Sequence, residues 1–210
     1  MICYASRTGT KRNIRALSDA AWRFLITPVG DTSAPCLPYA LDNGAWSAFQ
    51  RSEPWDQSKF ERMLVRLADK ADWVVAPDVV AGGLPSLELS VSWLDRLSSS
   101  CRLVLIAVQD GMTPDDLLPF IGPDVGIFLG GSTEWKLQTM QSWGDFCAVH
   151  GVHYHVARVN TLNRIAASHR AGAASIDGSS ASRFAVSLPP LDFAARQSDL
   201  FDPRRMLACR

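Results

Sequence analysis

Ala173-Ala174-Ser175-Ile176-Asp177-Gly178-Ser179-Ser180 is a short apolar stretch that ends on a carboxylate and then turns over glycine and serine. We interpret it as a late, buried strand with an aspartate at its carboxyl end, where an α/β barrel places catalytic groups. Four other apolar runs end on polar or glycine residues in the same way: Leu41-Asp42-Asn43-Gly44, Val75-Ala76-Pro77-Asp78, and the segments 106–111 and 127–132. Five such ends favour a fold that gathers the carboxyl ends of its strands at one site.

Eight segments have the composition of short strands, and helical segments separate most of them. They are 2–5, 23–27, 37–41, 73–76, 103–108, 125–129, 153–157 and 173–176. Such alternation predicts a parallel sheet, and eight units in 210 residues fit a compact (β/α)8 TIM-type barrel. A doubly wound open sheet is the alternative, but it brings five strand ends around one axis less readily. We expect a single domain over 1–210, with the tail after about residue 185 partly irregular.

Apolar residues at helical spacing predict helices between these strands. The expected helices cover 11–22, 60–67, 85–97, 133–150 and 161–170. Thr113-Pro114-Asp115-Asp116 opens a further helix with a cap, a proline and acids in the first turn. We expect Thr133 to cap its helix, the segment 43–55 to be a long connection, and Leu188-Pro189-Pro190 to be a break.

The composition excludes several classes of protein. Twenty-one basic and 21 acidic residues cancel, so a nucleic-acid partner would need a local basic patch. There is no run of 18 apolar residues and no start typical of a signal peptide, so we expect a cytoplasmic protein without a membrane partner. The five cysteines are scattered without a C-x-x-C pair, which argues against a disulfide framework and a cysteine-rich zinc site.

Three histidines lie close together at His150, His153 and His155, and the last two share a face of one expected strand. No carboxylate has a spacing that completes a metal site, so we expect a structural or surface role for them, and no metal or cofactor. We expect most of the seven tryptophans to pack in the core, with one or two able to stack a base.

Together, the five strand ends supply three carboxylates, one carboxamide and a glycine-lined backbone. This set suits a flat heterocycle such as guanine, because a carboxylate accepts two hydrogen bonds from an N–H/NH₂ edge and an amide donates to a carbonyl. Two carboxylates then remain for chemistry at a glycosidic carbon. Other interpretations stay open: Asp42 and Asp78 as turn formers, Gln109 as a partner of its own turn, and Gly130-Gly131 as a tight turn or phosphate loop.

In this order the motifs resemble those of the tRNA-guanine transglycosylases and their DNA-acting relatives, which insert 7-deazaguanines. The resemblance covers roughly residues 39–183. It implies that Asp42, in a D-S/N-G-G-like motif, is the general acid/base and that Asp177, after an R/A-G-V-D-like approach, is the nucleophile. It also implies a set of residues that hold the base. These are Asp78, Gln109, Gly130 and Gly131.

The chain departs from the tRNA enzymes, which carry a C-x-C-x-x-C…H zinc subdomain after the nucleophile. Here only Cys209 follows Asp177, and the chain stops too early for an added RNA-binding domain. It therefore looks more like the short, phage-type DNA-guanine transglycosylases, a barrel lacking the zinc subdomain. This resemblance implies a pentosyltransferase that exchanges guanine in single-stranded or flipped-out DNA for a 7-deazaguanine base through a covalent aspartyl–glycosyl intermediate. It further implies action in the cytoplasm, of the host if the protein is phage-encoded. A helper protein is a further candidate partner.

Basic side chains are candidates for binding the phosphate backbone of DNA. The late candidates are Arg158, Arg164, Arg170 and Arg183, and the early ones, which are otherwise a solvated helix face, are Lys11, Arg12 and Arg15. Three other functions stay open: the same chemistry on tRNA, a non-catalytic nucleic-acid-binding subunit, and an unrelated barrel hydrolase or isomerase that uses two carboxylates. The presence of both Asp42 and Asp177 opposes the non-catalytic subunit.

Overall fold

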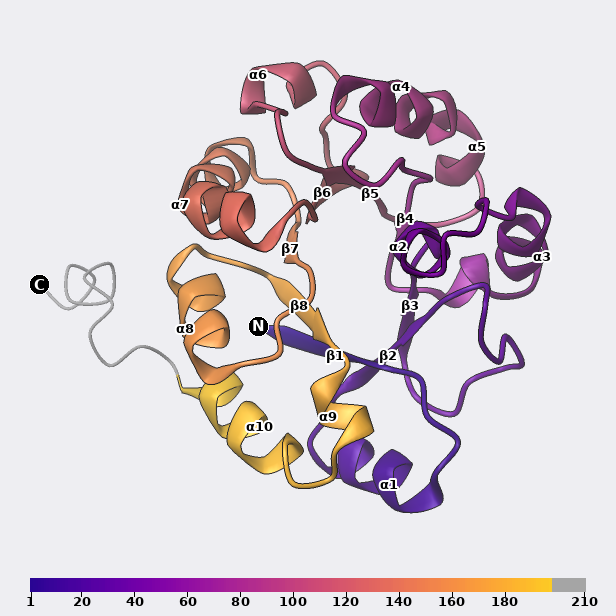
Figure 1. Cartoon of the computed structure of the whole chain (residues 1–210), viewed down its shortest axis with the longest axis vertical. Coiled ribbons are helices and arrows are strands. Elements are labelled where there is room, and N and C mark those ends of the chain that lie inside the picture. The colour runs from indigo at the N-terminus through magenta and orange to yellow at the C-terminus, as the bar shows by residue number, and fades with distance from the viewer. Residues whose placement is uncertain (198–210) are drawn as a thin grey trace, which may run out of the picture.

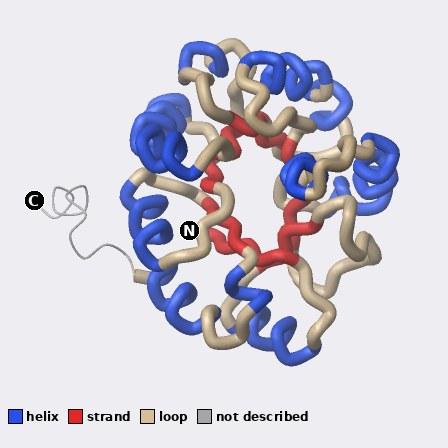
Figure 2. Tube along the Cα trace, viewed as in Figure 1, coloured by secondary structure: helices blue, strands red, loops and turns tan. Residues whose placement is uncertain are grey.

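A closed ring of eight parallel strands forms the centre of the computed structural model, which describes residues 1–197 (Figure 2). Each strand pairs with the next in sequence, and the last pairs with the first. The strands are β1 (Ile2–Ser6), β2 (Arg23–Ile26), β3 (Tyr39–Leu41), β4 (Val74–Val75), β5 (Val104–Val108), β6 (Val125–Leu129), β7 (Tyr154–Val156) and β8 (Ser175–Gly178). The prediction of a (β/α)8 barrel is confirmed, and the open sheet is excluded.

Most helices surround this ring on the outside (Figure 1). The helices are α1 (Lys11–Asp19), α2 (Ala45–Gln50), α3 (Gln57–Leu67), α4 (Leu84–Ser92), α5 (Leu94–Ser98), α6 (Pro114–Leu117), α7 (Thr133–His150), α8 (Leu162–Arg170), α9 (Ser180–Arg183) and α10 (Leu188–Arg196), with a 3-10 turn at Ala68–Lys70. In this view α2 lies over the rim of the ring, near β3 and β4 (Figure 1, Figure 2). Within residues 1–197, no helix has both the length and the apolar character needed to cross a bilayer. Cys209 and the tail from residue 198 lie outside the described residues.

Two apolar clusters make up the core. The larger one lies between the strands and the surrounding helices. The smaller one fills the inside of the barrel, because its residues alternate along successive strands and none comes from a helix: Tyr4, Leu25, Ala40, Trp73, Val75, Leu105 and Ala107. The continuous apolar run of β5 follows from this arrangement, since all five of its residues are buried and the strand is covered on both faces.

Several local predictions are wrong in detail, for identifiable reasons. The segment expected as a connection contains α2, a helix of one to two turns that begins on Gly44 in the left-handed region (φ 81°). The single helix expected over 85–97 is two helices, α4 and α5, which meet at Trp93. Ser132, not Thr133, caps α7, because its side chain accepts the N–H of Trp135.

The expected break at Leu188-Pro189-Pro190 is also wrong, since these prolines begin α10 instead. Proline is tolerated in the first helical turn, where its missing N–H has no partner to lose. The capping prediction at Thr113 is confirmed: its side chain and that of Asp116 form a capping box at the start of α6.

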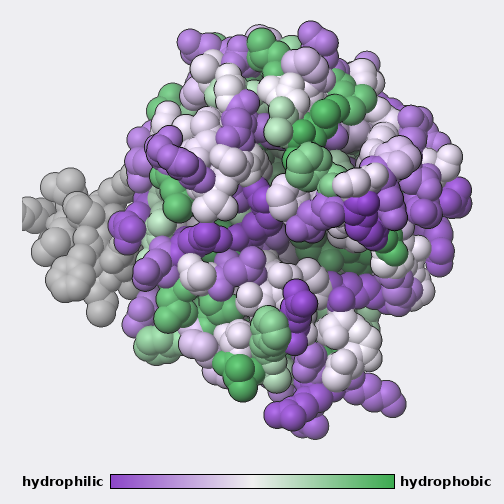
Figure 3. Space-filling model, in the orientation of Figure 1, coloured by the Kyte–Doolittle hydropathy of each residue, from purple (hydrophilic) through white to green (hydrophobic). Residues whose placement is uncertain are grey.

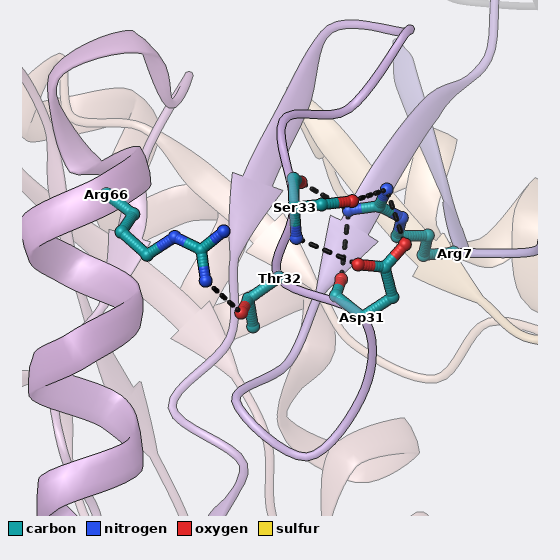
Figure 4. Close-up of polar contacts among 5 residues, drawn as sticks. All are labelled: Arg7, Asp31, Thr32, Ser33 and Arg66. Atoms are coloured by element: carbon teal, nitrogen blue, oxygen red, sulfur yellow. Dashed lines mark hydrogen bonds and ion pairs between the residues drawn. The ribbon is translucent and has the colours of Figure 1, made fainter.

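Arg7 fixes the loop between β2 and β3 against the end of β1 (Figure 4). Its guanidinium donates to the backbone oxygens of Asp31 (2.9 Å) and Ser33 (2.7 Å) and forms an ion pair with the Asp31 carboxylate at 2.8 Å. The same loop packs its Pro28 against Gly44, where an added Cβ would lie 2.8 Å from the proline ring. This loop therefore supports the turn that follows Asp42.

Helices α7 and α8 approach each other closely at Gly144. A Cβ added there would lie 1.9 Å from the backbone oxygen of Ala171 and 3.2 Å from the ring of Tyr154. Neither group can move without shifting the end of α8 or the barrel wall, so only glycine fits.

We expect Gly144→Ala to lower the free energy of unfolding by about 1–3 kcal/mol through overpacking. Gly122→Ala is the matched control, because an added Cβ there meets no atom within 4 Å. Chemical denaturation of both variants tests this. Equal stability of the two would contradict the close approach of α7 and α8.

Candidate active site

The five polar strand ends lie at one end of the barrel, because all eight strands are parallel. Over the middle of the face shown in Figure 1 the surface is mostly hydrophilic (Figure 3). The structure brings the three carboxylates together: the negative charges of Asp177 and Asp78 both act on Asp42, and Gln109 donates a hydrogen bond to Asp78. The structure thus brings together the carboxylates that we predicted at the strand ends.

Asp177 has one carboxylate oxygen held by the protein and one left open. Its side chain is 11% exposed. Oδ1 lies 2.9 Å from Nε2 of His155 and accepts the backbone N–H of Arg158 at 3.2 Å. Oδ2 has no hydrogen-bond partner among the described residues and keeps contact with solvent. A carboxylate with one fixed and one free oxygen is suited to attack an electrophilic carbon.

Asp42 is held in a state that can both give and take a proton. Although part of its surface is open, the surrounding protein removes it from water, and the charges of Asp177 and Asp78 add to this effect, so its pKa is raised to about 7. The backbone N–H of Gly44, 3.4 Å from Oδ1, opposes the shift only weakly. A pKa near the working pH is what general acid–base catalysis requires.

Asp78 lies at the centre of a hydrogen-bond network. Asn43 donates from its amide to Asp78 Oδ1 at 2.6 Å and to the backbone oxygen of Ala76 at 2.7 Å. Gln109 donates to the other oxygen of Asp78 and accepts the N–H of Ala81. Burial raises the pKa of Asp78 to about 6 and outweighs the opposing hydrogen bond from Asn43. Gln109 is therefore bonded into this network and not only to its own turn.

At Gly130 and Gly131 the backbone passes close to neighbouring groups at this end of the barrel. Gly131 has φ 68°, and a Cβ there would lie 2.5 Å from the ring of Trp135 and 2.8 Å from the carboxylate of Asp110. The carbonyl oxygen of Gly131 accepts a hydrogen bond from the guanidinium of Arg158. At Gly130 a Cβ would lie 3.2 Å from the backbone oxygen of Val108. Both positions thus favour glycine.

Arg158 spans the mouth of the barrel. Its backbone has φ 58°, which is unusual for a residue with a side chain, and its guanidinium lies 4.2 Å from the ring centre of Trp46 on α2. The same group reaches Gly131 and interacts with the charges of Asp177 and Asp78. Arg158, which we expected near Asp177 as a candidate contact of a nucleic-acid backbone, lies within the site beside Asp177, Asp78 and Gly131.

None of the other candidate basic residues is among the charges that act on Asp42 or Asp78. Arg164 is half-buried near the start of α8, whereas Arg183, on α9, and Lys11 and Arg12, at the start of α1, are exposed. Arg170 ends α8 and so lies toward the opposite end of the barrel, because helices in this fold run antiparallel to the strands. Arg170 is therefore not part of the site.

Three residues of the site were missed by sequence reasoning: Asn43, Trp46 and His155. Asn43 directly follows Asp42. Its side chain is almost fully buried (1% exposed), and its amide is hydrogen-bonded within the protein. Trp46 is exposed and stacks with Phe49, 5.7 Å between ring centres. His155, for which we expected a structural or surface role, is fully buried, with Nε2 2.9 Å from Asp177 Oδ1. The signal available was its position two residues after His153 in an otherwise apolar strand.

A cleft of about 560 Å³ adjoins this cluster at Gly44. It lies between the β2–β3 loop and the start of α3, and its lining includes Trp55, Arg51 and Lys59. Asp42, Asp78 and Asp177 do not line it.

The chain matches no protein-family model and no curated protein.

The pKa of Asp42 should fall when the charge of Asp177 is removed. We expect Asp177→Asn to lower it from about 7, because the neighbouring negative charge is one of the causes that raise it. Carboxyl ¹³C NMR titration of both proteins measures this. An unchanged pKa would mean that the two carboxylates do not interact. Asp124→Asn, an exposed position before β6, is the control and should leave the titration unchanged.

Proposed function

We propose that the protein is a DNA-guanine transglycosylase that exchanges guanine in DNA for a 7-deazaguanine derivative. The observation that carries this proposal is a pair of carboxylates in different environments: Asp177, with one oxygen held and one free, and Asp42, with a pKa of about 7. Such a pair fits a nucleophile and a general acid/base at a glycosidic carbon. The motif order described above supports the choice of guanine as the base.

The network around Asp78 supports recognition of a guanine edge. Each oxygen of Asp78 accepts one hydrogen bond from the protein, one from Asn43 and one from Gln109, and keeps a lone pair for the N–H and NH₂ groups of the base, while the backbone at Gly130-Gly131 offers further polar contacts. The exposed indole of Trp46 presents an aromatic face that already stacks on the planar guanidinium of Arg158. A purine ring is a chemically similar partner for that face.

The reaction then consists of two displacements at C1′ of a deoxyribose. In the first, Asp177 Oδ2 forms a bond to C1′ while the bond from C1′ to N9 of guanine breaks, and the proton on Asp42 neutralises the departing base. In the second, N9 of the incoming 7-deazaguanine bonds to C1′, its proton passes to Asp42, and the electron pair of the C1′–Oδ2 bond returns to Asp177. Neither step changes the oxidation state of any group.

Coupling between the two carboxylates favours this sequence. The negative charge of Asp177 helps to raise the pKa of Asp42, so Asp42 holds a proton before the first step. Formation of the ester removes that charge, which lowers the pKa of Asp42 and stabilises it as the base needed for the second step. When Asp177 is released, its charge returns and Asp42 again retains the proton.

The polymer is proposed to be DNA, with the target base outside its stack. A base reaches strand ends inside a barrel mouth only when flipped out or unpaired, which costs a few kcal/mol and favours single-stranded substrate. Arg164, Arg183, Lys11 and Arg12 are proposed contacts of the phosphate backbone, since all four lie on segments that begin at the same end of the barrel as the carboxylates.

A base-exchange assay with labelled guanine tests the function, with duplex DNA, single-stranded DNA and tRNA offered in parallel. We expect label to enter DNA, and Asp177→Ala and Asp42→Ala to lower the rate by about 1,000-fold or more. Asp124→Asn should leave it unchanged, because that residue is exposed before β6 at the other end of the barrel. Ester formation should slow as pH rises through about 7, where Asp42 loses its proton.

Two results would contradict this proposal. Label that enters only tRNA would move the activity to RNA. No incorporation into any polymer, by folded protein supplied with guanine or a 7-deazaguanine, would assign the carboxylates to another reaction.

Asp78→Asn tests recognition separately from chemistry. Loss of one acceptor oxygen should raise KM for the free base by about 10- to 100-fold, the effect of one hydrogen bond to a charged group. Because loss of the Asp78 charge also lowers the pKa of Asp42, kcat is compared at the pH optimum of each protein, where it should change less. Asp124→Asn again serves as the control. A loss confined to kcat would place Asp78 in the chemical step instead.

A further inference from the structure

A line of hydrogen bonds runs from Asp177 into the interior of the barrel. Nε2 of His155 lies 2.9 Å from Asp177 Oδ1, and its Nδ1 lies 2.8 Å from the hydroxyl oxygen of Ser175. That same hydroxyl oxygen lies 2.8 Å from Nε2 of His153. All four residues come from the neighbouring strands β7 and β8 or, for His153, from the residue before β7.

The chemistry of these groups fixes the direction of every bond. An ionised Asp177 only accepts, so His155 donates from Nε2. Burial lowers the pKa of His155, which keeps the ring neutral, and Nδ1 must then accept from Ser175. The hydroxyl of Ser175 in turn accepts from Nε2 of His153, a ring whose pKa burial lowers to about 4. The relay therefore holds His155 in the tautomer that carries its proton on Nε2.

Aromatic rings fix the orientation of His155 as well. Phe128 stacks on the imidazole with 4.9 Å between ring centres and 11° between planes. Trp73 lies 4.6 Å away and Tyr4 6.0 Å away. His155 is fully buried. Branched aliphatic side chains dominate the interior of most barrels of this kind, and polar side chains buried there are costly unless they are hydrogen-bonded, as the residues of this line are.

We propose that His155 is a positioning residue that presents a fixed Nε2–H to Asp177, so that this N–H and the backbone N–H of Arg158 stabilise Asp177 as the leaving group of the second displacement. This inference rests on the proposed function. Both donors converge on Oδ1, at 2.9 and 3.2 Å, and leave Oδ2 free for the bond to C1′.

The two steps use these donors differently. When C1′–Oδ2 forms, Oδ1 becomes an ester carbonyl oxygen and accepts hydrogen bonds less strongly. When N9 of the incoming base attacks C1′, the C1′–Oδ2 bond breaks, its electron pair returns to the carboxylate, and negative charge develops on Oδ1. The two N–H donors already point at Oδ1, so they stabilise the negative charge that develops there in the transition state, as the donors of an oxyanion hole do. Their loss should therefore slow release of the ester more than its formation.

The tautomer is tested first, on the free protein. Long-range ¹⁵N NMR of the imidazole rings should show His155 with its proton on Nε2, the signal being assigned by its absence in His155→Gln. Ser175→Ala removes the hydroxyl that donates to Nδ1 and should shift the Nδ1 signal, while the proton stays on Nε2 because Asp177 still accepts it. A proton on Nδ1 in the unsubstituted protein would overturn the relay. This measurement needs no DNA and does not depend on the proposed reaction.

The release role is tested by following the covalent protein–DNA adduct after rapid quenching. His155→Phe keeps a ring but removes the donor, and we expect adduct release to slow by about 100-fold, so that the adduct accumulates. His155→Gln retains an N–H near the position of Nε2 and should restore most of the rate. Thermal denaturation of both variants separates these effects from loss of folding.

Three outcomes would overturn the release role. Equal slowing of adduct formation and release in His155→Phe would mean that His155 only holds Asp177 in place and does not stabilise it as a leaving group. A folded His155→Gln as slow as His155→Phe would exclude the donor as the cause. Failure of the unsubstituted protein to form any adduct would refute the proposed function and with it the release role, while the tautomer result would stand.

Discussion

Pairing between the first and the last strand is the interaction on which the site depends. Ile2 pairs with Ser175, and the register continues to Ala5 and Gly178. This pairing closes the barrel, so β8 has neighbours on both sides and Asp177 lies inside a wall of strands. In an open sheet the ends of β3 and β8 would be separated, and the charge of Asp177 would not act on Asp42. Closure thus creates the electrostatic coupling between the two carboxylates.

Positive charge at the barrel mouth compensates for the carboxylates. Arg158 interacts with the charges of Asp177 and Asp78, and the loss of water that burial causes lowers the pKa of its own guanidinium. Asp42 has no ion-pair partner among the described residues, and burial raises its pKa to about 7. The same set of groups therefore holds Asp42 near half-protonation at neutral pH and leaves one oxygen of Asp177 free. The difference between the carboxylates arises from their neighbours, because all three have the same intrinsic chemistry.

The barrel and the positions of its strand ends could be predicted from the sequence, since each apolar run ends on a polar residue and the strands alternate with helices. The gathering of Asp42, Asp78 and Asp177 followed from parallel strands. His155 could not be placed in the same way, because a histidine in an apolar strand can face the barrel interior or the helices until the register is known. The helix α2 escaped prediction because its six residues include exposed Trp46 and Phe49 and lack an amphipathic pattern. Nothing in the sequence marks Arg158 as a residue with a left-handed backbone.

Asn43 connects the ends of β3 and β4 with the start of α2. Its side-chain amide donates to Asp78 and to the strand end at Ala76, while its side-chain oxygen accepts the N–H of Ala45 at 2.8 Å. One residue thus clamps the ends of two adjacent strands and the start of α2. The hydrogen bonds of Asn43 set the spacing between Asp42 and Asp78, so the ends of β3 and β4 move together. Any ligand held by Asp78 is thereby kept in register with the proton on Asp42.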